Sequence, residues 1–79
     1  GQADGSKADV EITRQIREAI VDDDSLSTNA KNVKIVTKDG LVNLRGPVAN
    51  AEESQKVASI AQKFAGPAKV KNDLEITKE

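Results

Sequence analysis

Two short runs of alternating apolar and polar residues flank an Asp-Gly pair and predict a β-hairpin over residues 33–46. Asp39 and Gly40 suit a two-residue type I′ turn, because both central residues of that turn have φ above zero. Such a turn gives one face the pairs Thr37 with Val42, Ile35 with Leu44 and Val33 with Gly46, and the other face the pairs Lys38 with Leu41, Val36 with Asn43 and Lys34 with Arg45. The first face is apolar and the second carries charge. The hairpin is the strongest structural signal in the chain, although it has no chemistry of its own.

Apolar residues at helical spacing predict one amphipathic helix before the hairpin and a second one after it. The first stripe consists of Ala8, Ile12, Ile16, Ala19 and Ile20, and the second of Val57, Ile60, Ala61 and Phe64. Val10 and Val21 lie almost opposite the first stripe, and we expect them to be ordinary surface residues. Asn50 followed by Glu53 predicts the capped start of the second helix, and Gly66-Pro67 predicts its end.

Between the first helix and the hairpin, polar residues predict a loop over residues 25–32 that Leu26 anchors in the core. The run Asp22-Asp23-Asp24 just before it raises the question of a calcium site. A calcium loop that began at Asp22 would need an oxygen ligand at its fifth position, where this chain has Leu26. We therefore interpret the three acids as a solvated helix end and expect no metal ion.

The last stretch, residues 68–77, alternates in polarity and predicts a third strand. Val70, Leu74 and Ile76 share its core-facing side with Asn72, whose amide we expect to lock a backbone turn rather than bind a ligand. The predicted fold is α+β, an αββαβ two-layer sandwich with two helices on one face of a three-stranded sheet. The sheet is mixed if the third strand lies beside the second, and antiparallel if it lies beside the first. We favour the mixed sheet.

Composition narrows the possible functions. The 79 residues suffice for one small domain over residues 8–79, preceded by a tail over residues 1–7 that we expect to be flexible. The chain has no Cys, His or Tyr to activate a nucleophile and no glycine-rich phosphate loop, so we expect neither enzymatic activity nor a cofactor. Twelve basic and thirteen acidic side chains nearly cancel, which argues against a nucleic-acid-binding protein. No run approaches the length of a membrane span, and the first residues do not resemble a signal peptide.

Three segments resemble the BON domain, a family named for bacterial osmotic-stress and nodulation proteins: the hairpin KDGLVNLRGPV, the helix start Asn50-Ala51-Glu52-Glu53 and the end GPAKVKNDLEI. The family pattern falls on Asp39, Gly40, Val42, Leu44, Gly46 and Val48, and then on Gly66, Val70, Asn72 and Leu74. The resemblance covers about residues 8–78 and departs at Pro67-Ala68, before the last strand, where the family usually has Val directly after Gly. The resemblance implies an αββαβ fold, a location in the bacterial periplasm or cell envelope, no enzymatic activity, and binding to phospholipid membranes or envelope components.

The outward face of the predicted sheet is the candidate binding surface. Five basic residues collect there around two apolar ones: Lys34, Lys38, Arg45, Lys69 and Lys71 around Val36 and Leu41. Lys34 opposite Arg45 is a like-charge pair, which destabilises a sheet unless an anion lies nearby. We predict peripheral binding of an anionic phospholipid membrane by these seven residues, without deep insertion, because the chain lacks the Trp and Tyr of interfacial anchors.

Two alternatives are compatible with the same residues. Exposed strands are commonly rich in lysine, which favours solubility and opposes aggregation, so the basic residues need not bind anything. A three-stranded sheet also has exposed edges, to which another BON module or an envelope protein could add a strand. In that case the chain would be a protein–protein interaction or oligomerisation module.

Overall fold

The computed structural model of the chain describes residues 7–77. Its elements in chain order are helix α1 (Lys7–Val21), short helix α2 (Thr28–Lys31), strand β1 (Lys34–Lys38), strand β2 (Leu41–Val48), helix α3 (Ala51–Ala65), a 3-10 helix (Pro67–Lys69) and strand β3 (Val70–Ile76). The predicted α+β fold is confirmed, with α2 as an additional element inside the predicted loop. Residues 1–6 of the predicted tail lie outside the described residues, and α1 begins at the last residue of that tail.

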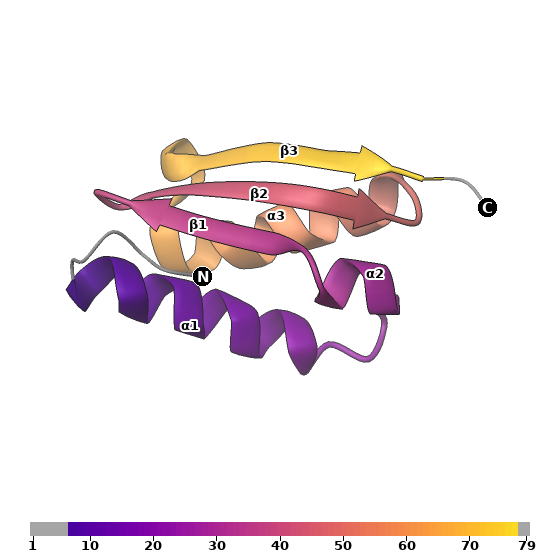
Figure 1. Ribbon diagram of the computed structural model, residues 1–79, viewed down its shortest axis with the longest axis horizontal. Coiled ribbons are helices and arrows are strands. Elements are labelled where there is room, and N and C mark those ends of the chain that lie inside the picture. The colour runs from indigo at the N-terminus through magenta and orange to yellow at the C-terminus, as the bar shows by residue number, and fades with distance from the viewer. Residues whose placement is uncertain (1–6, 78–79) are drawn as a thin grey trace.

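The three strands form one mixed sheet in the order β1-β2-β3. β1 pairs antiparallel with β2, and β3 pairs parallel with β2, so the favoured arrangement is confirmed. The hairpin register is also as predicted for all five residue pairs of β1 and β2. At the turn, φ is 52° for Asp39 and 80° for Gly40, as a type I′ turn requires. Figure 1 shows the strands as one layer, with α3 behind the sheet and α1 beside β1.

The core lies between the sheet and the helices, and its buried apolar residues in the described part of the chain are all aliphatic. They are Ile16, Ile20, Leu26, Ala30, Val33, Ile35, Val42, Leu44, Val48, Val57, Ala58, Ile60 and Ala61. Among the predicted stripe residues, Ile12 and Ala19 are partly buried and pack against this core. Two others lie outside it, because Ala8 is exposed and Phe64 is 39% exposed. Both lie in the terminal turn of their helix, where fewer neighbouring elements remain to cover them. Val10 and Val21 are exposed, as predicted.

β3 starts later than the sequence pattern predicts. The strand begins at Val70 and not at Ala68, because Pro67–Lys69 form a 3-10 helix directly after Gly66. Proline favours such a helical start, since its φ is fixed and its missing N–H needs no partner there. The difference falls where the sequence departs from the BON pattern.

The core-facing side of β3 is only partly covered, because β3 is an edge strand. Val70 and Leu74 are half-buried, whereas Asn72 is exposed and Ile76 is 49% exposed. Asn72 still faces the helix layer, since its Nδ2 donates to Ser54 Oγ of α3 at 3.0 Å. The predicted phase of the strand is therefore correct, and the predicted burial holds for only part of it.

Gly46 lies at a close approach between β2 and the residue that precedes β1. Its φ is +131°, and a Cβ at this position would lie 3.3 Å from the Cα of Val33. A side chain would therefore meet backbone atoms, which cannot rotate away.

Replacing Gly46 with alanine should lower the free energy of unfolding by about 2 kcal/mol, because strained backbone and the contact with Val33 add up. Gly40→Ala is the matched control: its φ is +80°, but a Cβ there would meet nothing within 4 Å, so we expect a loss of about 1 kcal/mol. Urea unfolding of both variants measures the difference. Equal losses would show that the close approach to Val33 has no energetic weight.

Candidate functional site

The hairpin turn that carries the candidate site is held in place by a buried carboxylate of α1. Asp9, which is 2% exposed, accepts hydrogen bonds from the backbone N–H groups of Asp39 and Gly40, each at 2.8 Å. In a two-residue turn these N–H groups have no ladder partner. Asp9 therefore fixes the turn against the first turn of α1, a role that the sequence pattern did not predict.

Two further polar residues of α1, each one helical turn further along, continue this contact along β1. Thr13 Oγ1 donates to Oγ1 of the buried Thr37 at 2.8 Å. Arg17 donates to the backbone carbonyl oxygens of Lys31 at 2.7 Å and Val33 at 2.6 Å. We call the set of Asp9, Thr13 and Arg17 the polar stripe of α1. The i, i+4, i+8 spacing of these residues in the sequence shows that they share one face of the helix. Nothing in the sequence identifies the groups of the turn, of β1 and of the segment before β1 that they bind.

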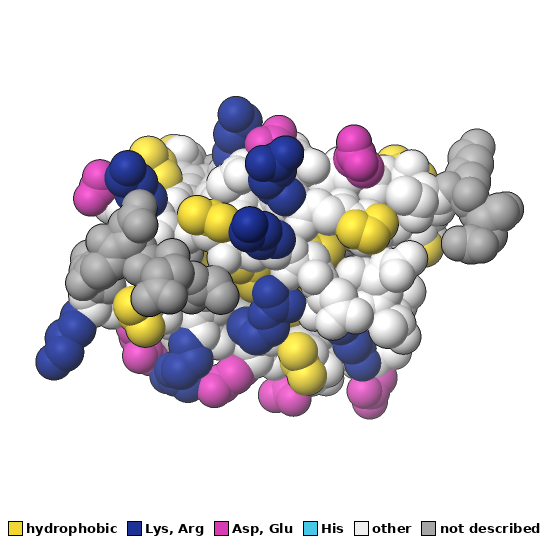
Figure 2. All heavy atoms as spheres, viewed as in Figure 1, with side chains coloured by type: hydrophobic (Ala, Val, Ile, Leu, Met, Phe, Trp, Pro, Cys, Tyr) yellow, Lys and Arg dark blue, Asp and Glu magenta, His cyan; other side chains and the backbone are white. Residues whose placement is uncertain are grey.

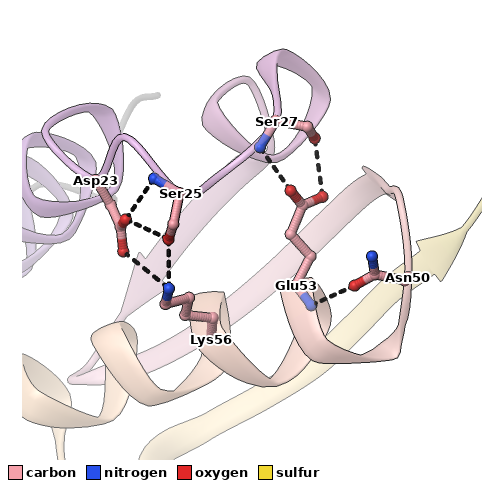
Figure 3. Close-up of polar contacts among 6 residues, drawn as sticks. All are labelled: Asp23, Ser25, Ser27, Asn50, Glu53 and Lys56. Carbon is pink, nitrogen blue, oxygen red and sulfur yellow. Dashed lines mark hydrogen bonds and ion pairs between the residues drawn. The ribbon is translucent and has the colours of Figure 1, made fainter.

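A second buried carboxylate joins α3 to the segment before α2 (Figure 3). Glu53, which is 8% exposed, accepts from the N–H of Ser27 at 2.5 Å and from the Ser27 hydroxyl at 2.8 Å. It also accepts from the N–H of Ala49 at 2.8 Å. Its own N–H donates to Asn50 Oδ1 at 2.8 Å, so the predicted N-cap is confirmed. Burial alone would raise the pKa of Glu53, but the donors from Ala49 and Ser27 outweigh it and hold the pKa below its ordinary value.

One of the three consecutive acids takes part in a polar network beside this contact. Asp23 accepts from the N–H of Ser25 at 2.9 Å and from the Ser25 hydroxyl at 2.6 Å, and these bonds lower the pKa of Asp23. Lys56 Nζ donates to Ser25 Oγ and lies 4.0 Å from Asp23 Oδ2 (Figure 3). Within residues 7–77, no group of three or more acidic, His or Cys side chains is placed to hold a metal ion.

A groove of about 360 Å³ opens on the outward face of the sheet. It lies at the end of the sheet where the ribbon of the hairpin turn is beside the start of β3 (Figure 1). Its apolar lining comes from Val36, Leu41, Val42, Ala68 and Val70, and its polar lining from Lys38, Lys69, Lys71, Asp39 and Asn43. Leu41 is 55% exposed, so an apolar side chain is accessible at the rim. The combination of an apolar floor and three lysines fits a ligand that is both apolar and anionic.

Five of the seven predicted site residues line this groove: Val36, Lys38, Leu41, Lys69 and Lys71. Lys69 does so from the 3-10 helix and not from the strand. Lys34 and Arg45 lie opposite each other further along the same face and outside the groove. Lys34 lines a different hollow of about 340 Å³ between β1 and α1. The structure thus brings five of the residues together and leaves two apart.

The charge on the outward face is partly balanced by an acid on β3. Asp73 lies opposite Arg45 in the parallel register, and its Oδ2 accepts from Asn43 Nδ2 at 2.8 Å and lies 3.8 Å from Lys71 Nζ. The like-charge pair of Lys34 and Arg45 therefore has an acid beside it and needs no external anion. Figure 2 shows Lys and Arg side chains over the middle of the sheet with apolar side chains between them, and acidic side chains along the upper and lower margins.

The groove also contains residues that the sequence pattern assigned elsewhere. Val42 and Val70 were expected in the core, yet these paired residues also line the groove at the turn end of the sheet. Ala68 reaches the groove through the 3-10 helix, which the alternating pattern of residues 68–77 did not predict. No helix among the described residues is both long and apolar enough to cross a bilayer.

Comparison with known proteins gives two matches that cover nearly the whole chain. The family model of the BON domain matches residues 8–78. Osmotically-inducible protein Y of Escherichia coli (strain K12) is 35% identical to the chain over 74 residues, which are 94% of this chain and 36% of that protein. The chain therefore spans about a third of the length of this curated relative.

Proposed function

Since this chain belongs to the BON domain family, we propose that it is a non-enzymatic binding module of the bacterial cell envelope that associates with anionic phospholipid through the groove on its sheet. The observation that carries the proposal is the lining of the groove, in which Lys38, Lys69 and Lys71 surround an apolar floor. The name of the relative, osmotically-inducible protein Y, supports a role in osmotic stress. The proposed location in the periplasm or cell envelope follows from membership of the BON family.

The proposed binding is shallow and sensitive to salt. Each lysine close to an anionic bilayer surface contributes about 1 kcal/mol, and this attraction falls off within a Debye length. Leu41 and the apolar floor can take up the upper part of an acyl chain beside the headgroup. The chain has no Trp or Tyr to hold it deeper in the interface. Lys34 and Arg45 contribute to the field of the same face without touching the groove.

Neutralising two lysines of the groove tests this proposal. The double variant Lys69→Gln/Lys71→Gln should bind phosphatidylglycerol vesicles about 30-fold more weakly than the unchanged chain at low ionic strength, as the loss of two such charges implies. Vesicle co-sedimentation measures the affinity, and phosphatidylcholine vesicles should bind neither protein. The matched control is Lys7→Gln/Lys63→Gln, which removes the same charge from exposed positions on α1 and α3. Equal weakening in the two double variants would indicate that net charge, and not the groove, determines binding.

A map of backbone amide shifts locates the contact. Titration with phosphatidylglycerol micelles should shift the amides that line the groove, with the largest changes at Leu41, Lys69 and Val70. Shifts centred on α1 or α3 would place the contact on the other layer. No shift at low ionic strength would contradict phospholipid binding by this domain.

A further inference from the structure

The outer edge of β3 presents backbone groups that no strand of the sheet uses. Thr77 N–H donates to the carbonyl of Val48 at 2.9 Å, and the direction of the backbone groups alternates along a strand. The N–H and C=O groups of Lys71, Asp73 and Glu75 therefore point toward β2. Those of Val70, Asn72, Leu74 and Ile76 point away from the sheet, as expected for an edge that another strand could join.

The opposite edge of the sheet is closed by the polar stripe of α1. Asp9 holds the N–H groups of the turn at one end of β1, and Arg17 holds the carbonyl of Val33 at the other end. Because α1 lies beside β1 (Figure 1), a strand that approached this edge would meet the helix and would have to displace Arg17 from the carbonyl of Val33. β3 is therefore the edge of this sheet to which a further strand has access.

One side chain occupies the middle of the β3 edge. Asn72 Oδ1 accepts the outward N–H of Leu74 at 3.0 Å, and Asn72 Nδ2 donates to Ser54 Oγ of α3 at 3.0 Å. The amide is thus held between α3 and the strand, and it takes up the donor that a partner strand would need. Asn72 is exposed, so burial does not explain why a polar amide is fixed there.

We propose that β3 is a self-pairing edge that Asn72 keeps closed, and that the strand it excludes is β3 of a second copy of this chain. The argument for a second copy is charge complementarity. In an antiparallel pair centred on Asp73, each Lys71 faces Glu75 of the other copy, which is a favourable cross-strand pair. In the same pairing, the outward N–H and C=O groups of Asn72 lie opposite those of Leu74 of the other copy, so the two residues can exchange hydrogen bonds across the two-fold axis.

Two features of β3 oppose this pairing in the native chain. The first is the bond from the Leu74 N–H to Asn72 Oδ1. In the dimer, Asn72 and Leu74 of the other copy would form the hydrogen-bonded pair next to the two-fold axis, and this bond occupies a donor of that pair. The second is Asp73, which would face Asp73 of the other copy, and like charges directly opposite each other are destabilising. Asn43 and Lys71 hold Asp73 on the outward face, so it cannot easily turn away.

Sedimentation velocity over a range of protein concentrations tests the proposal. Asn72→Ala frees one outward N–H on each copy, so it should strengthen dimerisation about 100-fold, or about tenfold for each released bond. Asn72→Asp keeps an oxygen for Leu74 N–H and should behave like the native chain. Asp73→Asn removes the like-charge contact and should strengthen dimerisation even with Asn72 in place, which keeps the test valid if Asn72→Ala does not fold.

The register has its own test. Lys71→Glu in the Asn72→Ala background places two acids opposite each other at both ends of the pair, so dimerisation should be lost. The Leu74 amide should exchange with deuterium faster in dilute Asn72→Ala than in the native chain, and more slowly again once the variant dimerises. A folded Asn72→Ala variant that stays monomeric at every concentration would overturn the proposal, and a dimer that survives Lys71→Glu would overturn the pairing about Asp73.

Discussion

Replacing Glu53 with alanine should lower the free energy of unfolding by about 4 kcal/mol. The carboxylate accepts three hydrogen bonds in a site that is 8% exposed, and alanine leaves the N–H groups of Ser27 and Ala49 without their acceptor. Because Glu53 joins α3 to the segment before α2, its loss loosens two elements at once. Urea unfolding followed by circular dichroism measures the change.

The neighbouring residue provides the control for this result. Glu52 is exposed in the same helical turn, and Glu52→Ala should change the unfolding free energy by less than about 0.5 kcal/mol. Glu53→Gln retains one acceptor oxygen and should lose about 2 kcal/mol. Similar losses for Glu52→Ala and Glu53→Ala would show that the negative charge near the start of α3, and not the contact with Ser27, is what stabilises the fold.

The pH dependence of the same variants follows from the lowered pKa of Glu53. In the unfolded chain a Glu has a pKa of about 4.3, and in the folded chain the pKa of Glu53 is lower. The folded state therefore gains stability from this group above the unfolded pKa and loses it as the pH falls through the folded pKa. The gap between the native chain and Glu53→Gln should be widest near neutral pH and should narrow below about pH 4.

Replacing Asp9 with alanine should lower the free energy of unfolding by about 3 kcal/mol. Asp9 is 2% exposed and is the acceptor for the N–H groups of Asp39 and Gly40. Without it, the turn is no longer held against α1. Hydrogen exchange should be faster at the amides of Asp39 and Gly40 than in the native chain, and thermal unfolding gives the global loss.

Two substitutions separate this contact from general effects of charge. Asp9→Asn keeps one acceptor oxygen and turns an NH₂ group toward the other N–H, so it should lose about 2 kcal/mol. Asp22→Ala, at an exposed position just after α1, removes the same charge and should have little effect. Unchanged exchange at the turn in Asp9→Ala would mean that the type I′ turn holds its shape without α1.

The parts of the fold that the sequence predicts are those determined by neighbours along the chain. The hairpin register depends on Asp39-Gly40 and on the alternation beside it, and all five pairs of β1 and β2 are as predicted. The N-cap of α3 follows from residues three positions apart. To predict the mixed sheet, it was enough to choose between two positions for β3, beside β2 or beside β1.

The contacts that the sequence did not predict join residues far apart in the chain. Asp9 and the turn are separated by 30 residues, and Glu53 and Ser27 by 26. A carboxylate near the start of a helix is usually exposed to solvent. The burial of Asp9 and Glu53 therefore becomes apparent only once their hydrogen-bond partners are known. The groove depends on the 3-10 helix at Pro67–Lys69, which brings Ala68 and Lys69 beside the hairpin.

The sheet also divides the chain into two sets of residues with separate tasks. The buried carboxylates, the polar stripe of α1 and the aliphatic core all lie on the helix side or at the β1 edge. On the outward face, Asn43 donates to Asp73 and to the backbone carbonyl of Lys71, and both of these bonds are exposed to solvent. Substitutions on that face can therefore accumulate at little expense to folding. A lineage that kept the same scaffold could acquire a different ligand by changing only a few outward residues.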